Sequence, residues 1–226
     1  MASKTTDFAP EVRAQRAYDY EEIKKILGKQ AYLMSANRRE EELDTLWTKE
    51  NTETASYGRN WGYYVGLDNI RAWYVGQNPI GAPGTCVCRP FTTHKIHIAD
   101  DGKTAQATWY SIGYETIQTE NGPKGYWDDC RCGADLILEA DGWKIWHFFS
   151  GSDFALEPGV PYANLKVFER TEADELNRKN FGEPTQVFEA YTADYNYYSY
   201  PKIATEYATF AETISNGPEG NPKYPG

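Results

Sequence analysis

Apolar residues recur at helical spacing near the start of the chain and at strand spacing beyond Pro90. A first helix is predicted by one apolar face, which holds Ile23, Ile26, Leu27, Gln30, Ala31 and Met34. Asn37 can cap a second short helix with Leu43, Leu46 and Trp47 on its apolar side. A short strand over Thr54–Tyr57 leads to an aromatic segment, Arg59–Gly66, which we expect to be a loop able to act as a lid. A third helix is expected from about Asp68 to Val75.

Two hairpins follow. The first has strands Phe91–Ala99 and Thr104–Ile117 around Asp101-Gly102, a pair typical of a two-residue turn. That turn would place Ile98 opposite Ala105, Ile96 opposite Ala107 and His94 opposite Trp109.

The second hairpin has strands Tyr126–Glu139 and Trp143–Ser150 around Ala140-Asp141-Gly142. A three-residue loop pairs Glu139 with Trp143, and counting back by twos pairs Asp135 with His147. We expect this pair to face the inside of the protein. Leu136, Leu138, Trp146 and Phe148 then fall on the opposite, outward face. Both faces are largely apolar, so helices should cover one and another sheet or subunit the other.

Composition narrows the class of protein. The chain has 226 residues, 40% of them hydrophobic and 25% charged, which indicates a folded domain. Its net charge of −10 argues against nucleic acid or an anionic membrane as a partner. No apolar run approaches the roughly 20 residues of a membrane span, and Met1–Pro10 lacks the apolar stretch of a signal peptide. A cytoplasmic location is expected.

The cysteines form two pairs, Cys86-x-Cys88 and Cys130-x-Cys132. Residues i and i+2 of a strand share a face, so the pairs can in principle converge on a metal. Zinc sites more often use a two-residue gap, and we therefore predict reduced, packed cysteines and no metal.

Two stretches resemble a known family. Residues Ala55–Gly58 and Gly62–Arg71, which read ASYG and GYYVGLDNIR, resemble the strand–loop–helix segment of SnoaL-like domains of the NTF2-like superfamily. Asp141-Gly-Trp-Lys-Ile-Trp-His147 resembles their last strand. The resemblance implies an α+β cone: three N-terminal helices packed on a strongly curved antiparallel or mixed sheet that encloses a pocket. It divides the chain into a disordered arm (1–14), the SnoaL-like domain (15–155) and a Tyr-rich C-terminal extension (156–226) docked on the domain or a neighbouring subunit.

Asp135 and His147 are the candidate catalytic residues. Directly opposed residues on antiparallel strands lie close enough for a hydrogen bond, and a carboxylate that orients an imidazole raises its basicity. Three interpretations stay open: His147 as general base held by Asp135, Asp135 as the base itself, or a purely structural pair. The candidate pocket-lining residues are Tyr32, Tyr57, Tyr63, Tyr64, His94, Trp109 and Trp127.

The family that these stretches resemble includes dehydratases, isomerases and polyketide cyclases that move a proton at carbon without a cofactor. The resemblance therefore implies a cofactor-free lyase, isomerase or cyclase acting on a small hydrophobic, aromatic or polyketide-like molecule. The alternatives are a ligand-binding protein without catalysis and a protein whose aromatic surfaces serve assembly. The apolar residues predicted on the outward face suggest a homodimer or higher homo-oligomer.

Overall fold

The computed structural model describes residues 8–76, 86–161, 163, 172–187 and 200–221. In chain order its helices are α1 (Pro10–Ser35), α2 (Arg39–Leu46), α3 (Leu67–Arg71), the π-helical turn η1 (Ala72–Gly76), α4 (Glu172–Phe181) and the 3-10 turns η3 (Phe210–Glu212) and η4 (Pro218–Gly220). Its strands are β1 (Ser56–Arg59), β2 (Gly62–Val65), β3 (Val87–Cys88), β4 (Thr92–Ile98), β5 (Thr104–Thr119), β6 (Gly122–Glu139), β7 (Gly142–Leu156) and β8 (Gln186–Val187).

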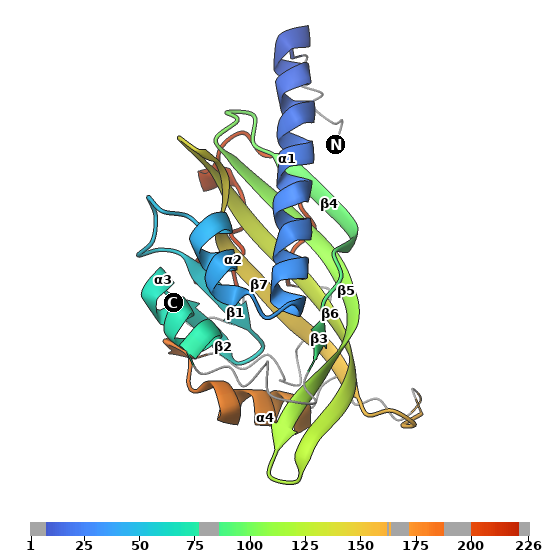
Figure 1. Cartoon of the computed structure of the whole chain (residues 1–226). Helices are drawn as coiled ribbons and strands as arrows, with labels where there is room; N and C mark the ends of the chain where they lie inside the picture. Colours follow the sequence, from blue (N-terminus) through green and yellow to red (C-terminus); the bar gives the residue numbers. More distant parts are fainter. Residues whose placement is uncertain (1–7, 77–85, 162, 164–171, 188–199, 222–226) are drawn as a thin grey trace.

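Within the described residues these strands form one mixed sheet in the order β3-β5-β6-β7-β1-β2-β8, with β4 also paired to β5. β1 runs parallel to β7, and the other strand pairings among the described residues are antiparallel. Helices α1 and α2 lie against one face of this sheet (Figure 1). The predicted α+β class with N-terminal helices on a sheet is confirmed. Among the described residues, no helix is both long and apolar enough to cross a membrane.

The first helix is longer than its apolar pattern required. It begins at Pro10, a residue suited to the first helical turn because it lacks the N–H that would be unpaired there. Residues 10–14 of the expected arm are therefore helical, and residues 1–7 lie outside the described residues. Ile23 and Leu27 are fully buried against the sheet, as the periodicity predicted.

An aromatic cluster fills the space between the helices and the sheet. The ring of Tyr57 lies 4.8 Å from that of Trp73 and 4.9 Å from that of Phe148, and Trp109 packs edge-on against Phe148 at 5.5 Å. Offset and edge-on contacts of this kind are the favourable arrangements for aromatic pairs. These side chains belong to the main hydrophobic core.

The β6–β7 hairpin differs from prediction at its turn. Glu139 pairs with Gly142, so the turn has two residues, and a bulge between Asp135 and Leu136 leaves Trp146 unpaired. The shorter turn shifts the strand register by one residue, and the bulge shifts it back by one. Asp135 consequently does pair with His147, and Gly133 with Phe149, as predicted.

The predicted faces of this hairpin are wrong. Leu136, Ile145 and Phe148 are buried in the core on the helix side of the sheet. Asp135 and His147 point to the opposite face, where they contact the chain's C-terminal residues. The bulge at Trp146 explains why Ile145 joins Phe148 on the helix side, because one extra residue in a strand changes which side chains share a face. Leu136 and Phe148 still lie on the face opposite Asp135 and His147, and it is that apolar face that the helices cover. Of the apolar residues that suggested a homodimer, Leu136 and Phe148 are thus buried within this chain, and Trp146 is half-buried on the face of His147.

The β4–β5 register matches the prediction near the turn, with Ile98 opposite Ala105 and Ile96 opposite Ala107. The pairing then shifts between Thr92 and Lys95, where Thr93 adopts a positive φ of 47°. His94 is therefore part of an irregularity and not of a regular pair with Trp109.

The aromatic segment after Arg59 is not a loop. Gly62–Val65 forms strand β2, which pairs with β1 in a hairpin and carries β8 on its other side. Gly62 has a φ of 146°, and a Cβ there would lie 2.1 Å from the Gln186 carbonyl oxygen. The glycine therefore permits close strand approach and does not indicate a lid.

The face of the sheet away from α1 is covered by residues 200–221, here called the C-terminal segment (Figure 1). Ala204 N–H donates to Thr108 Oγ1 (3.2 Å), and Asp100 N–H donates to the Tyr207 carbonyl (3.0 Å). The apolar hairpin was predicted to need a layer on both faces, and the C-terminal segment of the same chain provides the layer opposite the helices. Tyr191, Tyr195, Tyr197 and Tyr198 of the Tyr-rich extension lie outside the described residues.

Candidate functional site

The predicted pair meets on neighbouring strands. Asp135 of β6 and His147 of β7 are directly opposed, and Nδ1 of His147 lies 2.8 Å from Oδ2 of Asp135. Asp135 is fully buried and His147 is 4% exposed. A buried carboxylate is tolerated only where hydrogen bonds replace its lost hydration.

Asp135 receives that compensation from three parts of the chain. Its Oδ1 accepts hydrogen bonds from Nε2 of Gln106 and Nδ2 of Asn216, both at 2.8 Å. Its Oδ2 accepts from the backbone N–H of Asn216 (2.7 Å) and from Ser215 Oγ (2.9 Å), besides His147. Strand β5 and the C-terminal segment together therefore hold the carboxylate in one orientation.

Ser215 is not arranged as the nucleophile of a Ser-His-Asp triad. In such a triad the serine contacts the imidazole nitrogen opposite the carboxylate. Here Ser215 Oγ lies 3.1 Å from Nδ1 of His147, the same nitrogen that meets Asp135. Ser215 Oγ also accepts the Gly217 N–H at 2.8 Å. Ser215 therefore holds the Asp135–His147 pair in place through its hydroxyl group.

These contacts fix the tautomer of His147. An ionised carboxylate can only accept, so in the neutral imidazole Nδ1 carries the proton and Nε2 holds the lone pair. Among the described residues, Nε2 has no hydrogen-bond partner. The imidazole is thus oriented by Asp135 on one side and available on the other.

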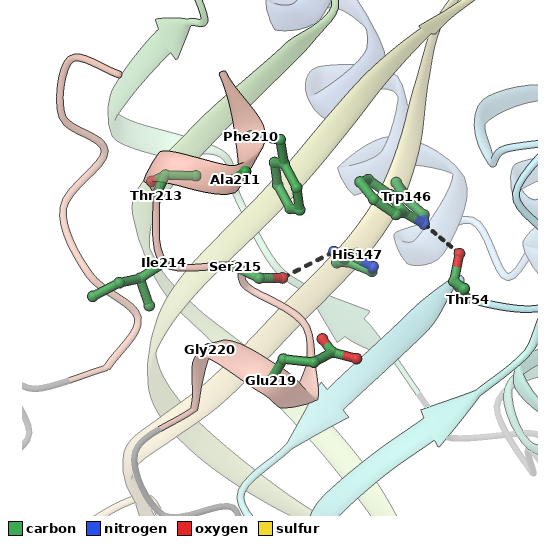
Figure 2. A pocket seen from close by; sticks show the side chains of 10 residues that line it. All are labelled: Thr54, Trp146, His147, Phe210, Ala211, Thr213, Ile214, Ser215, Glu219 and Gly220. Carbon is green, nitrogen blue, oxygen red and sulfur yellow. Dashed lines mark hydrogen bonds between the residues drawn. The ribbon is translucent and has the colours of Figure 1, made fainter. Parts of the chain in front are cut away.

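His147 lines a cavity of about 540 Å³ (Figure 2). The wall combines strand β7, the turn two residues before β1 and the C-terminal segment. It consists of Thr54, Trp146, His147, Phe210, Ala211, Thr213, Ile214, Ser215, Glu219 and Gly220. A volume between about 300 and 1,000 Å³ with apolar walls and few polar groups is typical of a small-molecule site.

Two aromatic rings stand beside the imidazole. The Trp146 ring stacks on the His147 ring with centroids 4.2 Å apart, and Phe210 lies 4.9 Å from Trp146. Trp146 Nε1 donates to Thr54 Oγ1 at 2.8 Å, which fixes the indole (Figure 2). The bulge that leaves Trp146 unpaired in the ladder places its ring at this wall.

Two buried tyrosines, Tyr63 of β2 and Tyr200 within the C-terminal segment, hold the backbone of Ser215 and Gly217 in place. The Tyr63 hydroxyl bonds that of Tyr200 at 2.9 Å, and the Tyr200 hydroxyl contacts the carbonyls of Ser215 and Gly217 at 3.3 Å. Burial raises the pKa of both tyrosines well above the ordinary value, so both hydroxyls stay protonated. Tyr63 was predicted to line the pocket. It does not line the cavity, and it contacts the site through its hydrogen bond to Tyr200.

The other predicted lining residues are dispersed. Tyr57, Tyr64 and Trp109 are buried in the aromatic core, with Tyr64 stacked on Trp73 at 4.1 Å. Tyr32 and Trp127 are 79% and 54% exposed. Tyr32 lines a separate cavity of about 330 Å³ beside α1. His94 and Trp109 line another of about 530 Å³ at the β4–β5 irregularity. None of the seven is on the wall that contains His147.

Sequence reasoning missed two buried charged groups on the helix side. Glu42 of α2 is fully buried, and its carboxylate accepts from Tyr74 (2.9 Å), Gln30 (3.3 Å) and Trp47 (3.4 Å). Burial raises the pKa of Glu42 to about 7. Arg89 forms buried ion pairs with Asp128 and Glu115. Neither Glu42 nor Arg89 shows a periodic signal that separates it from surface charges.

The four cysteines do not converge on one site among the described residues. Cys130 Sγ donates to Asp128 at 3.3 Å, Cys132 Sγ to Ser150 at 3.6 Å, and Cys86 is exposed. Burial raises the pKa of Cys132 to about 12, so its thiol stays protonated.

Comparison with known proteins gives a family and a fold. A family model described as a SnoaL-like domain matches residues 15–148. No curated protein sequence matches the chain. Structural similarity at low sequence identity indicates a shared fold and not a shared reaction.

Three solved structures illustrate that likeness. An NTF2-like superfamily protein from Salmonella enterica serovar Typhimurium has a TM-score of 0.51 at 15% identity, covering 65% of this chain and 99% of its own. A Kribbella flavida protein has a TM-score of 0.52 at 15% identity, covering 62% and 95%. A Streptomyces avermitilis protein described as a candidate dehydratase of the NTF2-like family has a TM-score of 0.50 at 15% identity, covering 60% and 97%.

Proposed function

This chain belongs to the SnoaL-like domain family, and we propose that it binds a small hydrophobic, ring-containing molecule and removes a proton from it with His147 as general base. The observation that supports this proposal is the free Nε2 of His147 at the wall of the 540 Å³ cavity, with Nδ1 held by Asp135. Proton abstraction from carbon by an oriented imidazole needs no cofactor.

In this proposal Asp135 is a positioning residue. It is fully buried and already accepts hydrogen bonds from Gln106, Ser215, Asn216 and His147. Because Asp135 is not among the residues that line the cavity, it contacts His147 and not the ligand. It also stabilises the imidazolium that forms when His147 takes up a proton.

The reaction class is that of a dehydratase, isomerase or polyketide cyclase, in which a C–H proton passes to Nε2 of His147. The electron pair left on carbon then either forms an enolate with an adjacent carbonyl group, or forms a C=C bond while a hydroxyl group leaves the neighbouring carbon and is protonated to water by the imidazolium. Trp146 and Phe210 supply the apolar walls for a flat substrate. A candidate dehydratase among the solved structures of this fold fits the same reaction class.

The test is solvent deuterium exchange. The protein is incubated in D₂O with whatever small molecule co-purifies, identified by mass spectrometry, and deuterium at acidic C–H positions is followed by NMR. We expect exchange in the wild type and a loss of about 10²-fold or more in His147→Gln, the usual contribution of a general base. His97→Gln, whose half-buried ring lies outside this cavity, is the matched control and should exchange at the wild-type rate.

A second candidate function is binding without catalysis. Its support is that Asp135 is bonded by the C-terminal segment as a structural anchor would be. A ligand that binds equally well to wild type and His147→Gln, with no exchange in either, would favour this candidate over the enzyme.

A further inference from the structure

We propose that the ligand of the His147 cavity is a protonated amine attached to a flat ring. This inference rests on the proposed function in that it takes the cavity to be a small-molecule site. It adds the charge and the chemical class of the molecule.

The charge of the wall points to a cation. The lining residues include one carboxylate, Glu219, and neither lysine nor arginine. Glu219 has no ion-pair partner among the described residues. The buried Asp135 carboxylate behind His147 adds a second negative charge, and the whole chain carries −10. An anionic ligand would meet repulsion here, and a cationic one would be attracted.

Glu219 is placed beside the base. A Cβ added at Gly217 would lie 3.1 Å from Oε2 of Glu219 and 3.2 Å from Cγ of His147, so both groups flank the same backbone carbon. The Glu219 side chain extends from η4 towards the cavity, on the side where His147 lies (Figure 2). An ammonium group held by Glu219 would therefore bring the neighbouring carbon atoms of the ligand close to Nε2.

The aromatic walls suit the same ligand. Trp146 and Phe210 stand 4.9 Å apart at an interplanar angle of 42°, and the Trp146 indole is fixed by Thr54. Tryptophan provides the strongest aromatic face for a cation, and aromatic walls with a carboxylate form a common arrangement for recognising ammonium groups. The rings also accept a flat ring by stacking.

Three indoles that carry different charges on the same two-carbon chain test the proposal: tryptamine (cation), tryptophol (neutral) and indole-3-propionate (anion). Isothermal titration calorimetry at physiological salt compares their affinities for the full chain. We expect tryptamine to bind about tenfold more tightly than tryptophol, and indole-3-propionate to bind most weakly. Trp146→Ala should weaken all three at least tenfold, which assigns the binding to this cavity.

The charge variant is Glu219→Gln. It should bring tryptamine to the affinity of tryptophol and leave tryptophol unchanged. Glu212→Gln removes the same charge from the same segment away from the wall, and it should leave all three affinities unchanged.

The outcomes separate the two proposals. If tryptophol or indole-3-propionate binds as tightly as tryptamine and Trp146→Ala weakens it, the amine proposal is overturned and the binding site stands. If Glu219→Gln and Glu212→Gln weaken tryptamine equally, the effect is general surface charge and the amine proposal is again overturned. If none of the three binds, the ligand-binding role of this cavity fails as well.

Discussion

Trp146 decides which side chains of β7 face the helices. It is the bulge residue between Ile145, which pairs with Leu136, and His147, which pairs with Asp135. Because of that one residue, Ile145 and Phe148 both reach the core while His147 turns to the other face. The identity of the site thus depends on a local irregularity that no sequence periodicity encodes.

A pair of alanine substitutions tests these faces. Phe148 is 3% exposed and packs against Tyr57 and Trp109, so Phe148→Ala should lower the free energy of unfolding by about 3–5 kcal/mol. Trp127 is 54% exposed and contacts Tyr114 edge-on at 5.9 Å, so Trp127→Ala should cost about 1 kcal/mol or less. Urea unfolding of both variants gives the comparison. Equal costs would mean that Phe148 does not face the core.

The C-terminal segment behaves as an element of the site. Asn216 contacts Asp135 through both its backbone and its side chain, at a sequence separation of 81 residues. Ser215 and Glu219 from the same segment form part of the cavity wall. Without this segment the Asp135 carboxylate would face solvent and the cavity would lose one side.

Asn216→Ala should loosen this element. It removes one hydrogen bond to a buried carboxylate, which costs about 1.5–3 kcal/mol of unfolding free energy. Amide hydrogen exchange should rise in residues 213–217 before it rises in the sheet, because the substitution frees the segment locally. Thr209→Ala, whose hydroxyl makes only a long 3.5 Å contact with Glu212, is the control and should leave exchange unchanged. Protection that stays at the wild-type level in Asn216→Ala would contradict this role.

Sequence patterns predicted most elements and one pairing of the site. The Asp101-Gly102 turn and the apolar spacing of Ile23 and Leu27 carry local signals, and the structure confirms them. The Asp135–His147 pairing was right although the turn and the bulge were not foreseen. Gly62 and Gly66 suggested a loop, whereas Gly62 begins a strand and Gly66 precedes α3.

The rest of the site was beyond sequence reasoning for physical reasons. The contacts of Ser215, Asn216 and Gln106 with Asp135 join distant positions of the chain, and each of these polar residues is common on surfaces. The single informative signal was that both faces of β6 and β7 are apolar, which required a second cover. It did not say which part of the chain provides that cover.

The stability of the whole molecule depends on pH through the buried carboxyl group of Glu42. Burial is the main cause that raises the pKa of this carboxyl to about 7, against 4.5 for the ordinary group, while Tyr74, Trp47, Gln30 and Arg39 lower it. Between these two values the folded protein retains a proton that the unfolded chain releases. Stability is therefore fully present below pH 4.5 and is lost as the pH rises through 7, by about 3 kcal/mol.

Glu42→Gln should flatten this dependence. The melting temperature of the wild type is expected to fall from pH 5 to pH 8, and the variant should fall less. Burial also raises the pKa of Asp153 to about 7, against the lowering effect of Arg131, so a residual slope in the same direction should remain. Thermal unfolding followed by circular dichroism at several pH values measures both slopes. Identical slopes in the two proteins would contradict the assignment to Glu42.

The match to the SnoaL-like domain family ends at residue 148, one position after His147, whereas much of the cavity wall comes from residues 210–220. We therefore expect a relative to inherit the Asp–His pair with the domain and to acquire its ligand preference from a different tail. Exchanging residues 200–221 between such relatives should then transfer ligand selectivity without altering the Asp–His pair, as replaceable loops do on rigid scaffolds. Sorting family members by their tails should group them by ligand better than sorting them by their domains.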